Sequence, residues 1–176
     1  MRDIRRIVTG HNAQGKSNIT FAGIATNVLD SAAWPGSRVT ELWVTEEMPV
    51  DNAGVADRGA RPIRHDPVPG GTIFRVVEIP PEDSATLDTE AVFAALGSTR
   101  LPTAEDTAKH PSMHATNSVD YLVVISGETY MIMEDGEILL RAGDCIVQRG
   151  TKHAWSNRGK VPCIMAAILV DAEPAV

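Results

Sequence analysis

Short runs of alternating apolar and polar residues, closed off by turn-forming residues, restrict the fold of this chain more than any other feature. The alternation places every second side chain on one face, as a half-buried strand requires. β-branched residues are concentrated in these runs, and Gly, Pro and Asn separate them at short intervals. The pattern is typical of an all-β sandwich or barrel. Nine strands are predicted, enough for two packed sheets: Ile4–Thr9, Asn18–Phe21, Val39–Val44, Thr72–Ile79, Asp120–Ser126, Glu128–Met133, Gly136–Leu140, Asp144–Gln148 and Cys163–Asp171.

One segment has a helical pattern instead. Residues Glu90–Leu96 are good helix formers, and Gly97 is suited to end a helix there. Asp88 or Thr89 would cap its amino terminus. The sequence therefore predicts a single short helix within an otherwise irregular connection.

A second connection, Met48–Gly71, is rich in Pro and Gly and is predicted as a long surface loop. It contains His65, which we expect to be solvated rather than catalytic.

The segment Gly10–Ser17 matches the phosphate-loop pattern G-x4-G-K-S and follows a predicted strand. A phosphate loop opens directly into a helix, but the residues after Ser17 are β-branched and include Gly23. We therefore interpret the segment as a polar hairpin turn and expect no nucleotide cofactor.

Length and charge exclude several classes of protein. The 176 residues suit one domain, with amino-terminal strands and an arm in residues 1–80 and a barrel region in residues 110–171. The chain contains no apolar run of the length that a membrane helix needs. The 16 Lys and Arg are outnumbered by 23 Asp and Glu, so the net charge of −7 disfavours nucleic acid as a partner.

The two cysteines, Cys145 and Cys163, lie in apolar runs and are too few for a disulfide scaffold or a four-cysteine zinc site. Residues 1–6 are charged and no apolar stretch follows them, so no secretory signal is predicted and the expected location is cytoplasmic.

Two motifs between residues 110 and 157 resemble those of the cupin family. The cupin patterns are G-x5-H-x-H-x3-4-E-x6-G and, roughly, G-D-x4-P-x-G-x2-H-x3-N. Thr116, Asp120 and Gln148 stand where the patterns have His, Glu and Pro, and Ala108 replaces the leading Gly. The aligned residues are His114, Thr116, Asp120 and Gly127 in the first motif, and Gly143, Asp144, Gln148, Gly150, His153 and Asn157 in the second. The Gly-Asp pair lies one residue closer to Gln148 than the second pattern has it.

The resemblance implies a double-stranded β-helix, a jelly-roll barrel, with additional amino-terminal strands and one short helix. Such barrels often pair through edge strands, so we expect a homodimer in which the amino-terminal arm takes part.

Strand geometry supports a metal site at these motifs. Residues two apart share a face, so the even-numbered residues from His114 to Asp120 would point into the barrel together, as would His153 and Trp155. Two imidazoles and one carboxylate from different strands form a set that binds Fe(II) and similar metals. We predict one divalent transition metal, Fe, Mn, Ni, Cu or Zn, held by His114, Asp120 and His153.

Other roles are open to each of these residues. His114 and His153 could be hydrogen-bonded core histidines. Asp120 could orient a histidine or join a hydrogen-bond network, because Asp is shorter than Glu. His110 has the phase of His114, but Pro111 makes a paired strand there unlikely and disfavours it as a ligand.

Five residues are candidates for the wall of a pocket: Thr116, Ser118, Met131, Met133 and Trp155. For the two methionines ordinary core packing is the stronger interpretation. Trp155 fits a core or pocket wall better than a catalytic role, and the Ser118 hydroxyl is expected to be solvated or bonded in a turn.

The first functional hypothesis is a metal-dependent enzyme (oxygenase, decarboxylase, dehydratase or isomerase) acting on a small, partly apolar substrate. No catalytic residue beyond the metal ligands is predicted. The alternative is a non-catalytic cupin that binds a small molecule and has lost its metal, as Thr116 and Gln148 would suggest.

Overall fold

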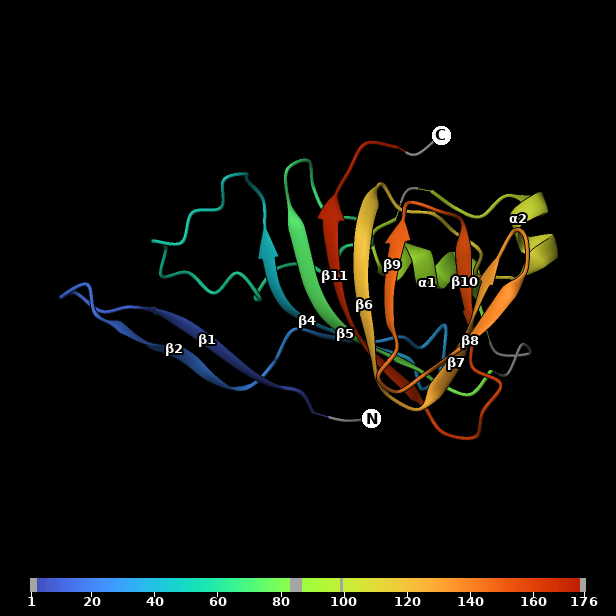
Figure 1. The fold of residues 1–176 in the computed structure, drawn as a ribbon, viewed down its shortest axis with the longest axis horizontal. Coiled ribbons are helices and arrows are strands. Elements are labelled where there is room, and N and C mark those ends of the chain that lie inside the picture. The colour runs from blue at the N-terminus through green and yellow to red at the C-terminus, as the bar shows by residue number, and fades with distance from the viewer. Residues whose placement is uncertain (1–2, 83–86, 99, 175–176) are drawn as a thin grey trace.

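Two antiparallel sheets pack against each other and form the body of the protein (Figure 1). The structure is a computed structural model that describes residues 3–82, 87–98 and 100–174. The six-stranded sheet has the order β3 (Val28–Asp30), β4 (Arg38–Thr45), β5 (Thr72–Ile79), β11 (Cys163–Asp171), β6 (Ser118–Ser126) and β9 (Cys145–Arg149). The three-stranded sheet has the order β10 (His153–Ser156), β7 (Glu128–Met133) and β8 (Glu137–Arg141).

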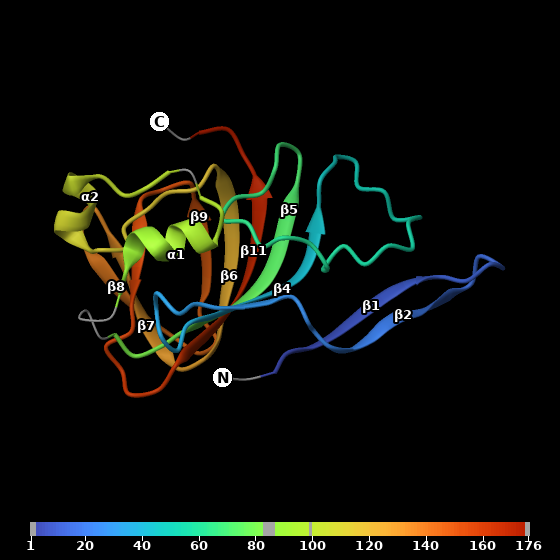
Figure 2. The ribbon, with the colours of Figure 1, turned by 180° about the vertical axis from the view of Figure 1, so that it is seen from behind.

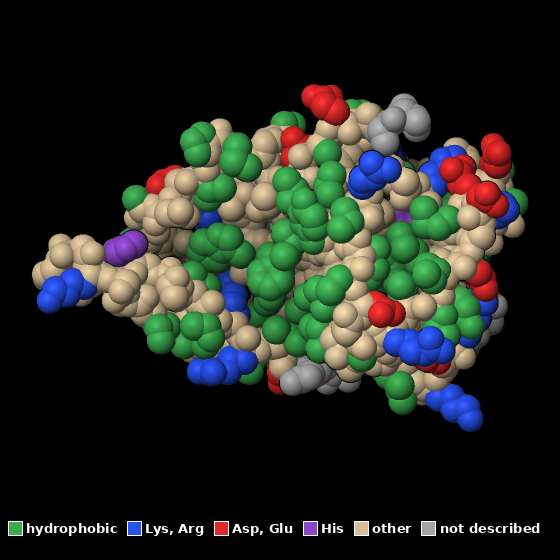
Figure 3. Space-filling view, viewed as in Figure 1, with side chains coloured by type: hydrophobic (Ala, Val, Ile, Leu, Met, Phe, Trp, Pro, Cys, Tyr) green, Lys and Arg blue, Asp and Glu red, His purple; other side chains and the backbone are tan. Residues whose placement is uncertain are grey.

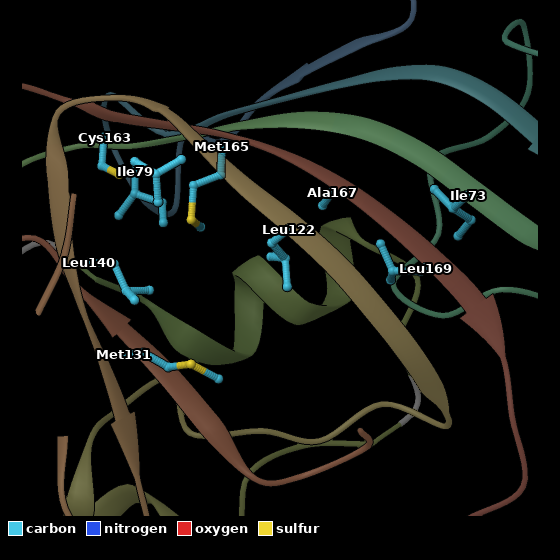
Figure 4. Packing of buried hydrophobic residues seen from close by; sticks show 10 residues of the cluster. Ile73, Ile79, Leu122, Met131, Leu140, Cys163, Met165, Ala167 and Leu169 are labelled. Carbon is cyan, nitrogen blue, oxygen red and sulfur yellow. The ribbon is translucent and has the colours of Figure 1, made fainter. Parts of the chain in front are cut away.

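The core lies between these sheets, and strand alternation fills it. Along β6 the even-numbered residues from Ser118 to Val124 are buried, and along β11 the odd-numbered residues from Cys163 to Leu169 are buried. Figure 4 shows the apolar side chains among them, Leu122 of β6 and Cys163, Met165, Ala167 and Leu169 of β11, on the side of the sheet where Met131 and Leu140 of the smaller sheet lie. Removing this apolar surface from water drives the two sheets together. The all-β jelly-roll barrel with extra amino-terminal strands is thereby confirmed.

A separate hairpin of β1 (Arg5–His11) and β2 (Ser17–Ile24) projects away from the barrel (Figures 1 and 2). In its turn the Asn12 side-chain oxygen accepts hydrogen bonds from the backbone N–H groups of Gln14 and Lys16, both at 3.0 Å. Strand β2, and not a helix, follows the turn. The interpretation of Gly10–Ser17 as a hairpin turn is confirmed.

The described part of the connection between β5 and β6 contains two helices, one more than predicted. Helix α1 (Thr89–Ala95) is the predicted one: the Asp88 side chain caps it, and Gly97 follows with φ 66°. Helix α2 (Ala104–Lys109) was predicted as irregular chain. A capping box, in which Thr103 and Asp106 bond reciprocally to each other's backbone N–H, stabilises its first turn.

The predicted bounds of β5, β7 and β11 agree with the structure, but β3 and β10 were not predicted. Both are short, with 3 and 4 residues, so neither carries enough alternation to stand out. In the described parts of the chain, no helix is long and apolar enough to cross a membrane.

Candidate functional site

A cavity of about 160 Å³ lies inside the barrel. It is lined by the inner face of the six-stranded sheet, β10 and helix α1, by the connections that precede β4 and β6, and by one residue of the long loop. Figure 2 shows α1 running across the barrel beside the sheet. The apolar lining consists of Leu29, Trp34, Val39, Val77, Val92, Phe93, Leu96, Leu122, Trp155, Ala167 and Leu169. The polar lining consists of Ser31, Ser37, Arg38, His65, Arg75, Glu78, Ser112, His114, Thr116, Asp120 and His153.

His114 and His153 come together through their own backbones. The backbone N–H of His114 donates to the carbonyl oxygen of His153 at 2.9 Å. In return, the backbone N–H of His153 donates to the carbonyl oxygen of His114 at 2.8 Å. This bridge connects the segment before β6 to the start of β10, and the ring centroids lie 4.3 Å apart. The two motif histidines therefore form a pair at the cavity wall.

Backbone carbonyls fix the tautomer of both rings. His114 Nδ1 lies 2.8 Å from the carbonyl oxygen of Ser112, and His153 Nδ1 lies 3.0 Å from that of Thr151. Because a carbonyl oxygen only accepts, each Nδ1 carries the hydrogen and each Nε2 keeps a lone pair.

Burial keeps the two rings neutral. It lowers the pKa of His153 from 6.5 to about 4. Burial, followed by the proximity of His153 and His65, holds the pKa of His114 well below its ordinary value. A neutral imidazole with its Nε2 lone pair free and its Nδ1 held by an acceptor is the form that binds metals.

Asp120 points inward from β6 but takes part in a hydrogen-bond network. The Ser118 hydroxyl donates to Asp120 Oδ1 at 2.5 Å and lies 2.8 Å from Thr116 Oγ1. Burial raises the pKa of Asp120, while the Ser118 hydrogen bond and the Arg75 charge oppose that rise. These contacts agree with the alternative in which Asp120 joins a hydrogen-bond network and is not a metal ligand.

The histidine pair fits two nitrogen ligands of a metal, but the full three-residue set is not assembled. Across residues 3–82, 87–98 and 100–174, no three His, Cys, Asp or Glu side chains are arranged so that they could hold a metal ion. The role of Asp120 as a third ligand stays a prediction.

The other candidate residues divide between the cavity and the core. Thr116 and Trp155 line the cavity. Ser118 is buried in contact with Asp120 and is not solvated. Met131 belongs to the core cluster and Met133 packs against it, as the core interpretation of both expects.

His110 lies apart from the cavity lining. Its Nδ1 accepts hydrogen bonds from Ser112, and its Nε2 lies 3.2 Å from Glu82 Oε1.

His65 is not solvated, so the expectation for it was wrong. Only 8% of the residue is exposed, and its ring lies 5.0 Å from that of His114 and 5.1 Å from that of Phe93, between centroids. The long loop folds onto α1, where the His65 N–H donates to the carbonyl oxygen of Leu96 at 2.7 Å. No local pattern encodes this contact, because it joins two distant irregular segments.

Arg75 also lines the cavity and was not singled out from the sequence. The sequence does contain a signal for Arg75. It lies an even number of residues from Ile73 and Ile79 on β5, so strand alternation places its side chain on the same buried face. A cation at a buried strand position requires a partner, and Glu41 on the neighbouring strand lies 3.0 Å away.

Residues 98–170 match the family model described as the cupin domain. The chain carries a cupin domain. The match covers β6 to β10, most of β11 and both motif histidines, and it confirms the resemblance of the two motifs. The cupin domain does not include His65 or helix α1, which precede residue 98.

Several fungal proteins are similar to this chain. Phomopsin biosynthesis cluster protein C' of Diaporthe leptostromiformis is 29% identical over 182 residues, which cover 99% of this chain and 82% of that protein. The cupin-domain-containing oxidoreductase virC of Hypocrea virens is 28% identical over 185 residues, 100% of this chain and 80% of that protein. The crystal structure of a Cupin 2 conserved barrel domain protein from Salinispora arenicola is 14% identical, with a TM-score of 0.45 over 83% of this chain and 82% of that chain.

Proposed function

We propose that this cupin is an enzyme that carries out an oxidation or reduction on a small, partly apolar molecule bound inside the barrel. The observation that carries the proposal is the cavity itself, which combines apolar walls with a pair of neutral imidazoles. Pockets of this composition are typical of small-molecule sites. The similarity to virC, which is named an oxidoreductase, supports this reaction class among those that cupins serve.

We infer that His114 and His153 bind a divalent transition metal through their Nε2 atoms, with Asp120 as the proposed third ligand. When bound, such a metal supplies Lewis acidity or redox chemistry. The chain's own residues position the substrate: Trp155 and Phe93 provide apolar surface, and Thr116 provides a hydroxyl for hydrogen bonding. The apolar walls also exclude water from the reacting groups.

Metal content tests this proposal. Untagged protein is purified without chelator, and the metal per chain is measured by elemental mass spectrometry for the wild type and for His114→Ala, His153→Ala and Asp120→Ala. His11→Ala, on the exposed hairpin, serves as the matched control. We expect close to one metal per chain in the wild type and the control, and strong loss in all three site variants.

Retention of full metal content in His153→Ala would overturn the ligand assignment. Loss in the two histidine variants with retention in Asp120→Ala would remove Asp120 from the ligand set alone. Circular dichroism of each variant separates loss of metal from loss of fold.

The second candidate is a metal-free cupin that binds a small molecule without turnover. The hydrogen bond from Ser118 to Asp120 favours it, because the carboxylate is engaged with a neighbour rather than with the histidine pair. Absence of metal after anaerobic reconstitution with Fe(II), Mn(II), Ni(II) and Zn(II) would decide for this candidate.

A further inference from the structure

The loop segment that carries His65 is anchored on both sides. Before it, the carbonyl oxygen of Arg64 accepts a hydrogen bond from the guanidinium of Arg75 on β5. At His65 itself, the backbone N–H donates to Leu96 at the carboxyl end of α1. Arg75 is in turn held by its buried ion pair with Glu41. His65 therefore occupies a fixed place at the cavity although it comes from an irregular segment.

A carboxylate determines which nitrogen of His65 carries the hydrogen. His65 Nδ1 lies 2.6 Å from Asp66 Oδ1, and the other oxygen of Asp66 lies 2.5 Å from the Arg100 guanidinium. Burial works to raise the pKa of Asp66, but the hydrogen bonds from His65 and Arg100 and the charge of Arg100 oppose it, and the pKa is lowered. The ionised carboxylate only accepts, so Nδ1 of His65 donates and Nε2 of the neutral ring is an acceptor.

Nothing in the described parts of the protein is hydrogen-bonded to His65 Nε2, although the ring lines the cavity. His65 also completes no three-ligand metal set with the other described residues. Its bond to a carboxylate distinguishes it from His114 and His153, whose Nδ1 atoms are held by neutral carbonyl groups. His65 is thus available to a ligand.

The size of the cavity limits what that ligand can be. A volume of about 160 Å³ is close to that of an apolar cavity of roughly 150 Å³ that binds benzene. It has room for one six-membered ring with small substituents, while the rest of a larger ligand would extend through the open side of the cavity. An entirely apolar ring would leave His65 Nε2 unpaired, whereas a ring with a hydroxyl group would pair it.

We propose that His65, oriented by Asp66, selects ligands that place a ring with a hydroxyl group inside the cavity. This proposal rests on the proposed function, because both take the cavity to be the binding site. His65 acts as a specificity-determining residue, since the hydroxyl donates to Nε2 while the ring packs against Phe93 and the other apolar walls.

Phenol and toluene test the proposal, because they differ only by a hydroxyl in place of a methyl group. Each compound is titrated into the protein as purified, in mildly alkaline buffer, and NMR measures its affinity. The ratio of the two affinities is then compared between variants. In His65→Phe we expect the ratio of phenol to toluene affinity to fall about tenfold. The matched control His11→Phe replaces an exposed histidine and leaves the ratio unchanged.

Asp66→Asn provides a second test at nearly constant shape. Arg100 only donates, so the amide oxygen turns toward Arg100 and the amide NH₂ turns toward His65 Nδ1. This reverses the tautomer, and Nε2 then carries the hydrogen. Because phenol is a better donor than acceptor, we expect the ratio to fall here too, and ¹⁵N chemical shifts of His65 report the reversal directly.

An unchanged ratio in His65→Phe, with toluene still bound, would overturn the role of His65 and leave the proposed function standing. If the wild type binds neither probe, the cavity is not a site for single rings and the proposal fails, whereas the metal measurement still tests the proposed function. If His65→Phe does not fold, the ratio in Asp66→Asn decides.

Discussion

The ion pair between Glu41 and Arg75 offers the sharpest test of how the cavity wall is held. Only 1% of Glu41 and 5% of Arg75 is exposed. Glu41→Gln keeps the shape but leaves the guanidinium without its nearest carboxylate. Breaking a buried pair in this way costs about 3–5 kcal/mol. Asp120 and Asp66 also attract Arg75, so we expect the lower end, about 3 kcal/mol.

For a chain of this length, each kcal/mol corresponds to a shift of roughly 2–4 °C in the midpoint of thermal unfolding, so Glu41→Gln should lower it by about 6–12 °C. Calorimetry at neutral pH measures this shift. The matched control is Glu137→Gln, which removes the exposed partner of Arg158 and should leave the midpoint nearly unchanged, because exposed ion pairs contribute little to stability. Equal midpoints for Glu41→Gln and Glu137→Gln would refute the assignment of Arg75 as the buried anchor.

Three further outcomes are expected. In chelator, the free energy of unfolding should fall by at least about 3 kcal/mol as pH drops from 6.5 to about 4, because unfolded His153 takes up a proton that the folded state excludes and His114 adds to this loss; urea titrations would show no such slope if the rings were solvated. Apolar side chains such as Tyr121 and Val147 are exposed on the outer face of the six-stranded sheet (Figure 3). We therefore expect sedimentation experiments to show a dimer, and we expect Tyr121→Lys to weaken it. A monomeric wild type would contradict this expectation. Thr103→Ala should cost about 1 kcal/mol by removing the cap of α2, and an unchanged urea midpoint would deny the cap that role.

Strand positions could be predicted because alternation is a local property. Strand β11 alternates along its whole length, and its predicted bounds agree with the structure. Strand β10 has only four residues and packs beside β7, so its pairing depends on partners distant in sequence. The motif nevertheless identified His153, because the spacing of the motif does not depend on recognising the strand.

The site was harder to predict than the fold, because about a third of the residues in its wall come from irregular chain. His114 and His153 could be located by motif and phase. His65 could not, since its burial depends on hydrogen bonds from the loop to Leu96 and Arg75. The phase argument correctly placed Asp120 inside the barrel, but phase does not reveal that Ser118 would donate to its carboxylate.

The paired backbone hydrogen bonds between His114 and His153 have a thermodynamic consequence for binding. They hold both imidazoles in register while Ser112 and Thr151 fix their rotation. The conformational entropy of ordering these side chains is therefore lost during folding and not when a ligand arrives. A ligand that contacts both Nε2 atoms meets a preorganised pair. Little further conformational entropy is lost when it binds, so its affinity is set mainly by the contacts that it makes.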